Sequence, residues 1–271
     1  MRKIRWALIA LLVAALCVPL GAQQPKKRIL FIGQTKGFHH DSTSYTMGTI
    51  WKLGQQTGVW DTWLKTDCGW ITKKPVKGGN QKNLGFFDAV IFYTTGTLDM
   101  DESQKADLLS FVKEDGKGFL GIHSATDTFY DWPEYAELIG GWFDQHPWNV
   151  FEAPLVVEDP SFPGMQHLPR ALSVRDEIYQ VKNYSRDKVR VLMSLDADKI
   201  DLKNPRVHRT DRDFAVVWAH NYGKGRVLYN GLGHPNEVWD RPDIQNMFIE
   251  QIKWVLGLVP GDATPRPKPA R

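Results

Sequence analysis

The stretch Gly118-Phe119-Leu120-Gly121-Ile122-His123-Ser124-Ala125 decides the fold of this 271-residue chain. Five residues typical of a buried strand end abruptly on His123, and its small neighbours let the backbone bend sharply there. At such a strand-to-helix turn, hydrolytic α/β enzymes present a Ser or Cys nucleophile. An imidazole acts instead as a base, an acid or a metal ligand, unless it only finishes the strand. His123 is therefore the first candidate site residue.

Other short apolar runs end in the same way, and segments with helical spacing separate them. This alternation predicts an α/β fold with a doubly wound, mostly parallel sheet of the flavodoxin kind. Between residues 150 and 184 several prolines interrupt short β-like runs, which predicts an irregular β-containing insertion or an antiparallel extension. The predicted strands are 28–33, 59–64, 88–93, 118–122, 189–195, 214–219 and 226–230, and the predicted helices are 42–56, 101–114, 132–139 and 243–256.

The two ends of the chain differ from this central domain. Residues 1–22 combine three basic residues with an apolar run and the small pair Gly21-Ala22, which is typical of a secretory signal peptide. The run is too short for a stable membrane-spanning helix, although an uncleaved anchor is the alternative. We therefore expect an exported protein, periplasmic or secreted, with a linker at 23–27, one domain at 28–258 and a disordered proline-rich tail at 259–271.

Charge and cysteine content narrow the function further. The formal charge of +3 comes from the first 22 residues, which hold three of the 34 Lys and Arg and none of the 31 Asp and Glu. A nearly neutral mature chain without a basic patch makes nucleic acid an unexpected partner. Cys68 is the only cysteine after the leader, so no internal disulfide is expected. Its polar loop lacks an elbow pattern, which disfavours a thiol nucleophile.

Histidines gather in four motifs that follow predicted strands or lie in the adjacent loops. Because parallel strands end at one edge of a sheet, these imidazoles are expected to converge there. Glu237 follows His234 by three residues and is a candidate to orient its ring, with helix capping as the alternative. His39, His40 and His146 have the alternative of being ordinary loop residues. The motifs are Gly37-Phe38-His39-His40-Asp41, the elbow at His123, Asp144-Gln145-His146-Pro147 and Gly233-His234-Pro235-Asn236-Glu237.

Two kinds of chemistry suit this set. His123 and His234 are candidate acid/base residues with Glu237, while His40, His123, His146 and His234 together would suit Zn²⁺ or a similar divalent ion. The spacing leaves both open. Tryptophans beside the motifs favour a sugar ligand, because a flat aromatic face suits the apolar face of a sugar ring, although core packing is their alternative role. The candidate substrate-binding residues are His39, Trp142, Gln145 and Trp239.

The order of these motifs resembles the ThuA-like (trehalose utilisation) family over residues 28–258. The resemblance rests on Gly37-Phe38-His39-His40, Gly121-Ile122-His123-Ser124-Ala125, Gly141-Trp142-Phe143 with His146, Asp176-Glu177-Ile178-Tyr179, Tyr222-Gly223-Lys224-Gly225-Arg226-Val227 and Leu232-Gly233-His234. It implies a fold similar to class I glutamine amidotransferases and a role in disaccharide catabolism, with keto-sugar intermediates. By motif match, His123 is the family's elbow histidine and His234 its late histidine. A histidine where amidotransferases carry Cys excludes glutamine hydrolysis.

The sequence therefore predicts an exported enzyme that acts on a disaccharide or keto-sugar glycoside by histidine acid/base or metal-assisted chemistry. The alternative from another class is a non-catalytic carbohydrate-binding or accessory protein with the same shell. A scaffold for other exported proteins is a weaker third hypothesis, since the chain has no heptad pattern.

Overall fold

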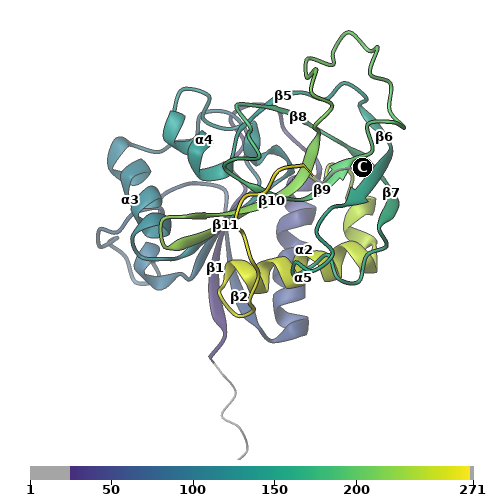
Figure 1. Cartoon of the computed structure of the whole chain (residues 1–271). Coiled ribbons are helices and arrows are strands. Elements are labelled where there is room, and N and C mark those ends of the chain that lie inside the picture. The colour runs from purple at the N-terminus through teal and green to yellow at the C-terminus, as the bar shows by residue number, and fades with distance from the viewer. Residues whose placement is uncertain (1–24, 269–271) are drawn as a thin grey trace, which may run out of the picture.

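Short apolar runs form the centre of a nine-stranded sheet in the computed structural model, which describes residues 25–268 (Figure 1). The strand order is β2-β1-β3-β4-β11-β10-β9-β6-β7. The first five strands in this order run parallel to one another, and β1, β3 and β4 are almost entirely buried. Their bounds are β2 Trp60–Lys65, β1 Lys27–Ile32, β3 Ala89–Phe92, β4 Gly118–Ile122 and β11 Gly225–Asn230.

The other four strands extend this sheet in antiparallel fashion. β10 (Ala215–Tyr222) pairs with β11 through a tight turn, and β9 (Arg190–Leu195) follows it. The region from 150 to 184 supplies β6 (Val150–Val157) and β7 (Ala171–Glu177) at the edge, which confirms the predicted antiparallel extension. Beside them, β5 (Trp142–Gln145) and β8 (Gln180–Lys182) form a separate two-stranded sheet.

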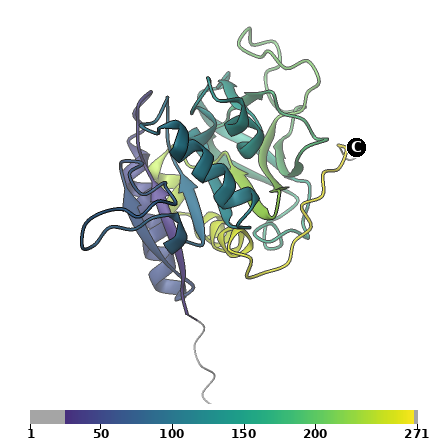
Figure 2. The same cartoon turned by 90° about the vertical axis from the view of Figure 1, so that its left-hand side faces the viewer.

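Helices cover both faces of the sheet, as the doubly wound prediction requires (Figures 1 and 2). α2 (Ser42–Thr57) and α5 (Pro242–Val255) pack on one face and share a core cluster with Trp60 and Trp239. α3 (Glu102–Lys113) and α4 (Pro133–Ile139) pack on the other face around a second cluster. Three 3₁₀ helices complete the fold: η1 (Leu84–Phe86), η2 (His123–Thr126) and η3 (Asn236–Asp240).

The segment after α5, which the sequence predicts to be a disordered proline-rich tail, contacts the domain through several side chains. Residues 259–268 lie against the antiparallel half of the sheet, where Arg190 forms an ion pair of 2.7 Å with Asp262. The Trp254 indole donates a hydrogen bond of 3.1 Å to the Gly261 carbonyl, and Arg266 donates one of 2.9 Å to the Glu158 carbonyl. These contacts hold a proline-rich sequence in place without helix or strand structure. The predicted signal peptide lies outside the described residues.

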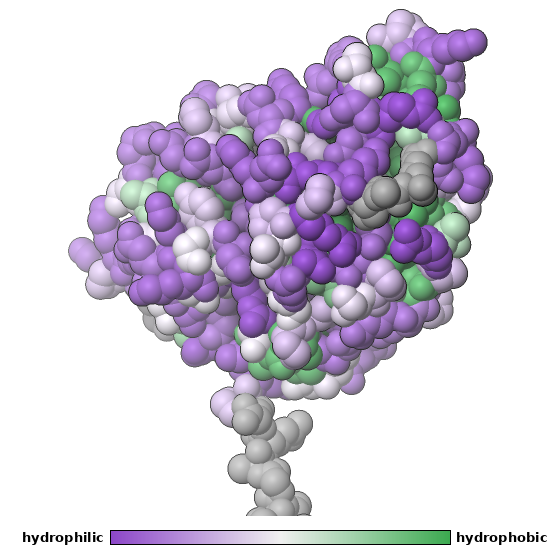
Figure 3. All heavy atoms as spheres, in the orientation of Figure 1, coloured by the Kyte–Doolittle hydropathy of each residue, from purple (hydrophilic) through white to green (hydrophobic). Residues whose placement is uncertain are grey.

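The surface carries no extended apolar face in the view of Figure 3, where apolar residues form small separate groups on a mainly hydrophilic surface. Within residues 25–268, no helix has the length and apolar character needed to cross a membrane.

Candidate active site

His123 stands at the turn that the sequence predicts. β4 ends at Ile122, and His123 begins η2 with a φ of 40°, in the left-handed region that most residues avoid. Close packing favours glycine two residues before it, because a Cβ on Gly121 would lie 2.7 Å from Cδ1 of Ile139. The Tyr229 hydroxyl donates a hydrogen bond of 2.7 Å to the His123 carbonyl. The strained elbow is thereby fixed, and the His123 side chain is fully buried.

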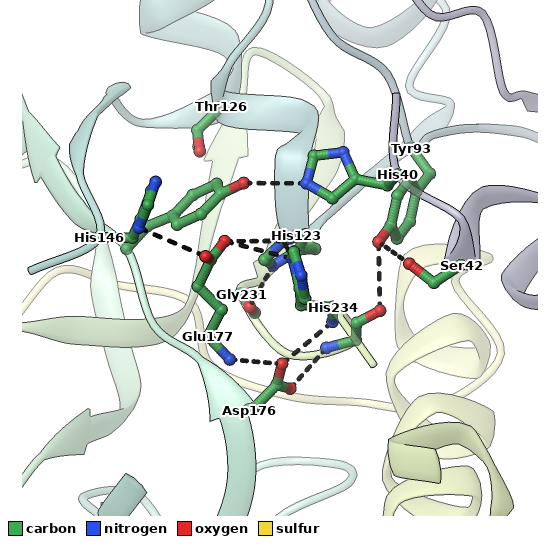
Figure 4. Close-up of polar contacts among 12 residues, drawn as sticks. His40, Ser42, Tyr93, His123, Thr126, His146, Asp176, Glu177, Gly231 and His234 are labelled. Atoms are coloured by element: carbon green, nitrogen blue, oxygen red, sulfur yellow. Dashed lines mark hydrogen bonds and ion pairs between the residues drawn. The ribbon is translucent and has the colours of Figure 1, made fainter. Parts of the chain in front are cut away.

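The carbonyl of Gly231, in the loop after β11, sets the tautomer of His123. It lies 3.0 Å from Nδ1, and a carbonyl only accepts hydrogen bonds, so Nδ1 carries the proton. Nε2 of the neutral ring then has a free lone pair, which points toward Nδ1 of His234 at 3.1 Å (Figure 4). A backbone carbonyl on one nitrogen is the usual support for a histidine that acts as a base or metal ligand through the other.

The loop that carries His234 is anchored by Asp176. This buried carboxylate accepts hydrogen bonds from the backbone N–H groups of Gly233 at 2.7 Å and His234 at 3.0 Å. The next residue, Glu177, ends β7 and places its Oε2 3.2 Å from Nδ1 of His234. Two adjacent acidic residues thus hold the same histidine, one by its backbone and the other by its ring (Figure 4).

His40 closes the cluster from the loop after β1. Its ring is 4% exposed and contacts the rings of His123 and His234 edge-on, each with centroids 5.1 Å apart. The hydroxyl of Tyr179 lies 3.3 Å from Nε2 of His40. The carboxyl ends of β1, β4, β7 and β11 therefore meet at one site, as expected where parallel strands end.

Four of these side chains form a set that fits a metal ion. One ligand atom each from His40, His123, Glu177 and His234 lies within 4.8 Å of all the others. Ligand atoms on a tetrahedral Zn²⁺ with bonds of 2.0–2.1 Å are about 3.3 Å apart. The separations of 3.1 Å between His123 and His234, and 3.2 Å between His234 and Glu177, are close to that spacing, whereas His123 and Glu177 are 3.8 Å apart, so an ion would draw the set together. Three imidazoles and one carboxylate are also the donor types that borderline divalent ions prefer.

The electrostatics divide the cluster into two pairs. Burial lowers the pKa of His40 to about 4 and that of His123 well below its usual value, so both rings are neutral. Burial also acts against charge on His234 and Glu177, but their mutual hydrogen bond and attraction outweigh it. The pKa of His234 is raised and that of Glu177 is lowered. Two imidazoles that resist protonation thus adjoin one whose protonation Glu177 favours.

His146 and Glu237 lie outside the four-residue set. Nδ1 of His146 is 3.3 Å from Oε1 of Glu177, on the side opposite His234, and 3.1 Å from the Arg206 guanidinium. His146 therefore neighbours the cluster through Glu177. Glu237 is exposed in η3. The carboxylate that reaches the His234 ring is that of Glu177, which differs from the sequence-based assignment.

Of the four predicted sugar-binding residues, some lie near the histidine cluster and others lie away from it. His39 is exposed at a cavity beside the cluster. Trp239 has no exposed surface, packs at a tilt against Phe248 and donates a hydrogen bond to the Gly233 carbonyl, so its ring belongs to the core that supports the His234 loop. Trp142 lines a different cavity, next to α4. Gln145 accepts a hydrogen bond of 2.8 Å from Arg206.

Sequence reasoning gave no role to Glu177 or Tyr179. Both belong to the quoted motif Asp176-Glu177-Ile178-Tyr179, so an acidic pair beside an aromatic residue was the available signal. Cys68 is buried, and burial raises the pKa of its thiol to about 12. A protonated, buried thiol is a poor nucleophile, in agreement with the sequence prediction.

Comparisons with known structures identify the class of this fold. A ThuA-like protein from Bacteroides uniformis superposes with a TM-score of 0.69 at 20% identity, covering 88% of this chain and 94% of that one. One from Parabacteroides merdae gives 0.65 at 19%, covering 86% and 90%. PurLQS from Thermotoga maritima gives 0.50 at 13%, covering 84% and 99%. The fold is the amidotransferase-like α/β fold, which confirms the sequence prediction.

The family described as ThuA, trehalose utilisation, matches residues 28–255. The chain therefore belongs to the ThuA family, as its motifs predict. No protein with a curated description matches it.

Proposed function

We propose that this protein is an exported enzyme that acts on a disaccharide or keto-sugar glycoside. The observation that carries the proposal is the convergence of His40, His123, Glu177 and His234, from four separate segments, to within 4.8 Å. Partly buried groups with shifted pKa values in a cleft are typical of active sites. The description of the family, trehalose utilisation, supports a saccharide substrate. The signal-peptide pattern of residues 1–22 supports export.

The chain supplies acid and base groups in the states that such chemistry needs. His123 is neutral but fully buried, and its Nε2 lies 3.1 Å from Nδ1 of His234, so it would take up a substrate proton through His234, which lines the cavity beside the cluster. His234, whose pKa Glu177 raises, is suited to return a proton or to stabilise a developing oxyanion. Glutamine hydrolysis is not part of the proposal, because His123 stands where the nucleophilic Cys would be.

The same atoms would hold a divalent ion such as Zn²⁺. His40, His123, Glu177 and His234 are the proposed ligands, and Glu177 takes the place in the set that the sequence assigned to His146. A bound ion would supply Lewis-acid polarisation of a sugar carbonyl or hydroxyl. In that case the Gly231 carbonyl orients His123 as an outer partner, and Asp176 fixes the loop of His234.

A non-catalytic carbohydrate-binding protein is the alternative. The observation that favours it is the elbow itself, which carries no Ser or Cys nucleophile in a fold that commonly has one. The cluster would then serve a structural or ligand-binding role.

The test combines metal analysis with turnover. Purified mature protein is analysed for bound metal and assayed with trehalose, other disaccharides and their keto derivatives, before and after chelation. We expect turnover in the parent and a loss of about 100-fold or more in kcat/KM for His123→Ala and His234→Ala. His167→Ala is the matched control, because His167 lies outside the cluster and bonds only the Asp243 carbonyl among the described contacts.

The outcomes separate the readings. Turnover that survives chelation supports acid/base chemistry, while turnover lost on chelation and restored by Zn²⁺ supports the metal. A parent that binds sugars without converting any of them supports the binding protein and ends the enzyme proposal.

A further inference from the structure

A cavity of about 670 Å³ opens beside the histidine cluster. His40 and His234 form part of its wall, whereas His123 and Glu177 do not line it and are almost completely buried. A ligand in this cavity therefore meets the cluster from the side of His40 and His234.

A second hollow of about 500 Å³ adjoins the first. Asp41 and Asn236 belong to the walls of both, so the two hollows share a border. The second hollow continues along α2, past Tyr45 and Gly48 to Lys52. Together they form an elongated depression that begins at the cluster and runs along one helix.

Each hollow has one exposed aromatic ring. Phe38 lies in the first and is 66% exposed, with its ring edge-on to His40 at a centroid distance of 4.9 Å. Tyr45 lies in the second, 38% exposed, and its hydroxyl donates a hydrogen bond to Asp240 that holds the ring in place. Aromatic rings held at the surface beside polar groups suit the apolar faces of sugar rings. The two tryptophans that the sequence suggested for this role lie elsewhere.

The charges around the depression favour a neutral ligand. The first hollow has the carboxylates of Asp41, Glu152 and Glu237, against the guanidinium groups of Arg175 and Arg241. Arg241 is already paired with Asp243 at 2.7 Å. Asp41 stands at the border, where a ligand would pass. The side chain of Asp41 is fully exposed to solvent, and Lys52 of the second hollow brings the Arg and Lys side chains to three against three carboxylates, so these groups offer no net positive charge to bind a phosphate or carboxylate.

From these observations we propose that the depression binds a neutral saccharide of at least two rings. The ring next to the histidine cluster stacks on Phe38, and the following ring stacks on Tyr45, with Asp41 and Asn236 bonding hydroxyls between them. Tyr45 thereby determines the preference for glycosides over single sugars. This inference rests on the proposed function for its saccharide class and adds the two subsites.

The test measures binding by calorimetry or ligand-observed NMR, so it does not depend on turnover. The probes are four neutral disaccharides (trehalose, sucrose, maltose and cellobiose), methyl α-glucoside as a single ring, and glucose 6-phosphate as a charged one. We expect at least one disaccharide to bind more tightly than methyl α-glucoside, and glucose 6-phosphate to bind most weakly. Tyr45→Ala should weaken the disaccharide about tenfold and leave methyl α-glucoside unchanged.

Two further variants complete the design. Phe38→Ala should weaken both ligands, and Tyr45→Phe, which keeps the ring, should retain most of the disaccharide affinity. Trp51→Ala is the matched control, because Trp51 is an exposed aromatic residue on α2 that lines neither hollow. The subsites are overturned if no disaccharide binds, if Tyr45→Ala has no effect, or if Trp51→Ala has the same effect as Tyr45→Ala.

The result is separable from that of the proposed function. Tyr45-dependent binding without any turnover leaves the subsites standing and ends the enzyme proposal. If a disaccharide is turned over and Tyr45→Ala leaves that turnover unchanged, the enzyme proposal stands and the subsites are overturned.

Discussion

Glu177 joins the parts of the site at the scale of single residues. One carboxylate oxygen faces His234 and the other faces His146, so the residue links two histidines that the sequence had grouped without it. In a buried cluster of imidazoles it is the only negative charge within the four-residue set. Divalent ions bind more strongly where a carboxylate offsets their charge, which makes Glu177 the decisive position for the metal hypothesis.

We predict that Glu177→Gln weakens Zn²⁺ binding by about 100-fold, because the amide is a weaker ligand and cannot balance the ion's charge. Isothermal titration with Zn²⁺ measures the effect. Glu237→Gln is the matched control, since Glu237 is exposed and belongs to the cavity wall rather than the ligand set. Equal losses of Zn²⁺ affinity in both variants would contradict this prediction and would support Glu237 as the carboxylate that orients His234.

Asp176 acts on the backbone of the same region. It accepts three backbone hydrogen bonds, from Glu177, Gly233 and His234, in a fully buried position. Burial raises its pKa to about 7, even though all three N–H groups favour the ionised form. The residue therefore serves as a brace between the end of β7 and the loop after β11.

We predict that Asp176→Asn lowers the free energy of unfolding by about 2–3 kcal/mol, because its amide cannot accept all three bonds and leaves buried N–H groups unpaired. Urea denaturation at neutral pH checks this. Asp115→Asn, which removes a half-exposed ion pair with Lys73, should stay within about 0.5 kcal/mol of the parent. If Asp176→Asn loses no more free energy of unfolding than this control, Asp176 does not stabilise the contact between the end of β7 and the loop after β11.

At the scale of elements, the elbow between β4 and η2 has no room for a side chain at Gly121. A Cβ on Gly121 would lie 2.7 Å from Cδ1 of Ile139 and 3.2 Å from Cβ of Ala125. We predict that Gly121→Ala destabilises the fold by about 2 kcal/mol through overpacking. In an Ile139→Val background, which removes the obstructing methyl group, the same change should cost measurably less. Additive effects of the two substitutions in urea denaturation would rule out this contact as the cause.

The elements that the sequence predicted well are those with strong local patterns. β1, β3 and β4 are buried on both faces, so each is a continuous apolar run with a clear stop. The elbow histidine and the late His234 follow from such strands. β7 is an edge strand with an alternating polar pattern, and nothing local shows that its last residue turns inward. The acidic pair in its recognised motif was thus the one signal for Glu177, and it does not show which way the side chain points.

The tryptophans show a second limit. Trp239 and Trp142 lie next to the histidine motifs in sequence, but whether a ring faces a ligand or the core depends on packing between distant elements. Trp239 is covered by Phe248 of α5, and Trp142 packs beside Tyr130. The exposed rings, Phe38 and Tyr45, carried no special signal. The packing of residues 259–268 is likewise set by long-range partners such as Arg190.

For the whole molecule, buried histidines make the stability of the fold depend on pH. His220 on β10 is 5% exposed, and neither of its ring nitrogens makes a hydrogen bond of normal geometry. Burial lowers its pKa to about 4, although the nearby backbone of Glu137 and Leu138 favours the charged ring. His40, in the site, has its pKa lowered to about 4 for the same reason. The folded protein thus holds neutral imidazoles that the unfolded chain would protonate at a higher pH.

This difference predicts that the buried histidines withdraw stability as the pH falls below 6.5, whereas Asp176, whose pKa is raised to about 7, acts in the opposite direction. Between pH 6.5 and about 4 the unfolded state binds the proton and the folded state does not, so stability is complete above pH 6.5 and falls as the pH decreases. For His220 alone the loss between pH 7.5 and 5 is about 2 kcal/mol. Urea denaturation at both pH values should show that His220→Phe reduces the pH-dependent loss by about this amount. A variant that loses stability as steeply as the parent would show that His220 takes up its proton equally well in both states.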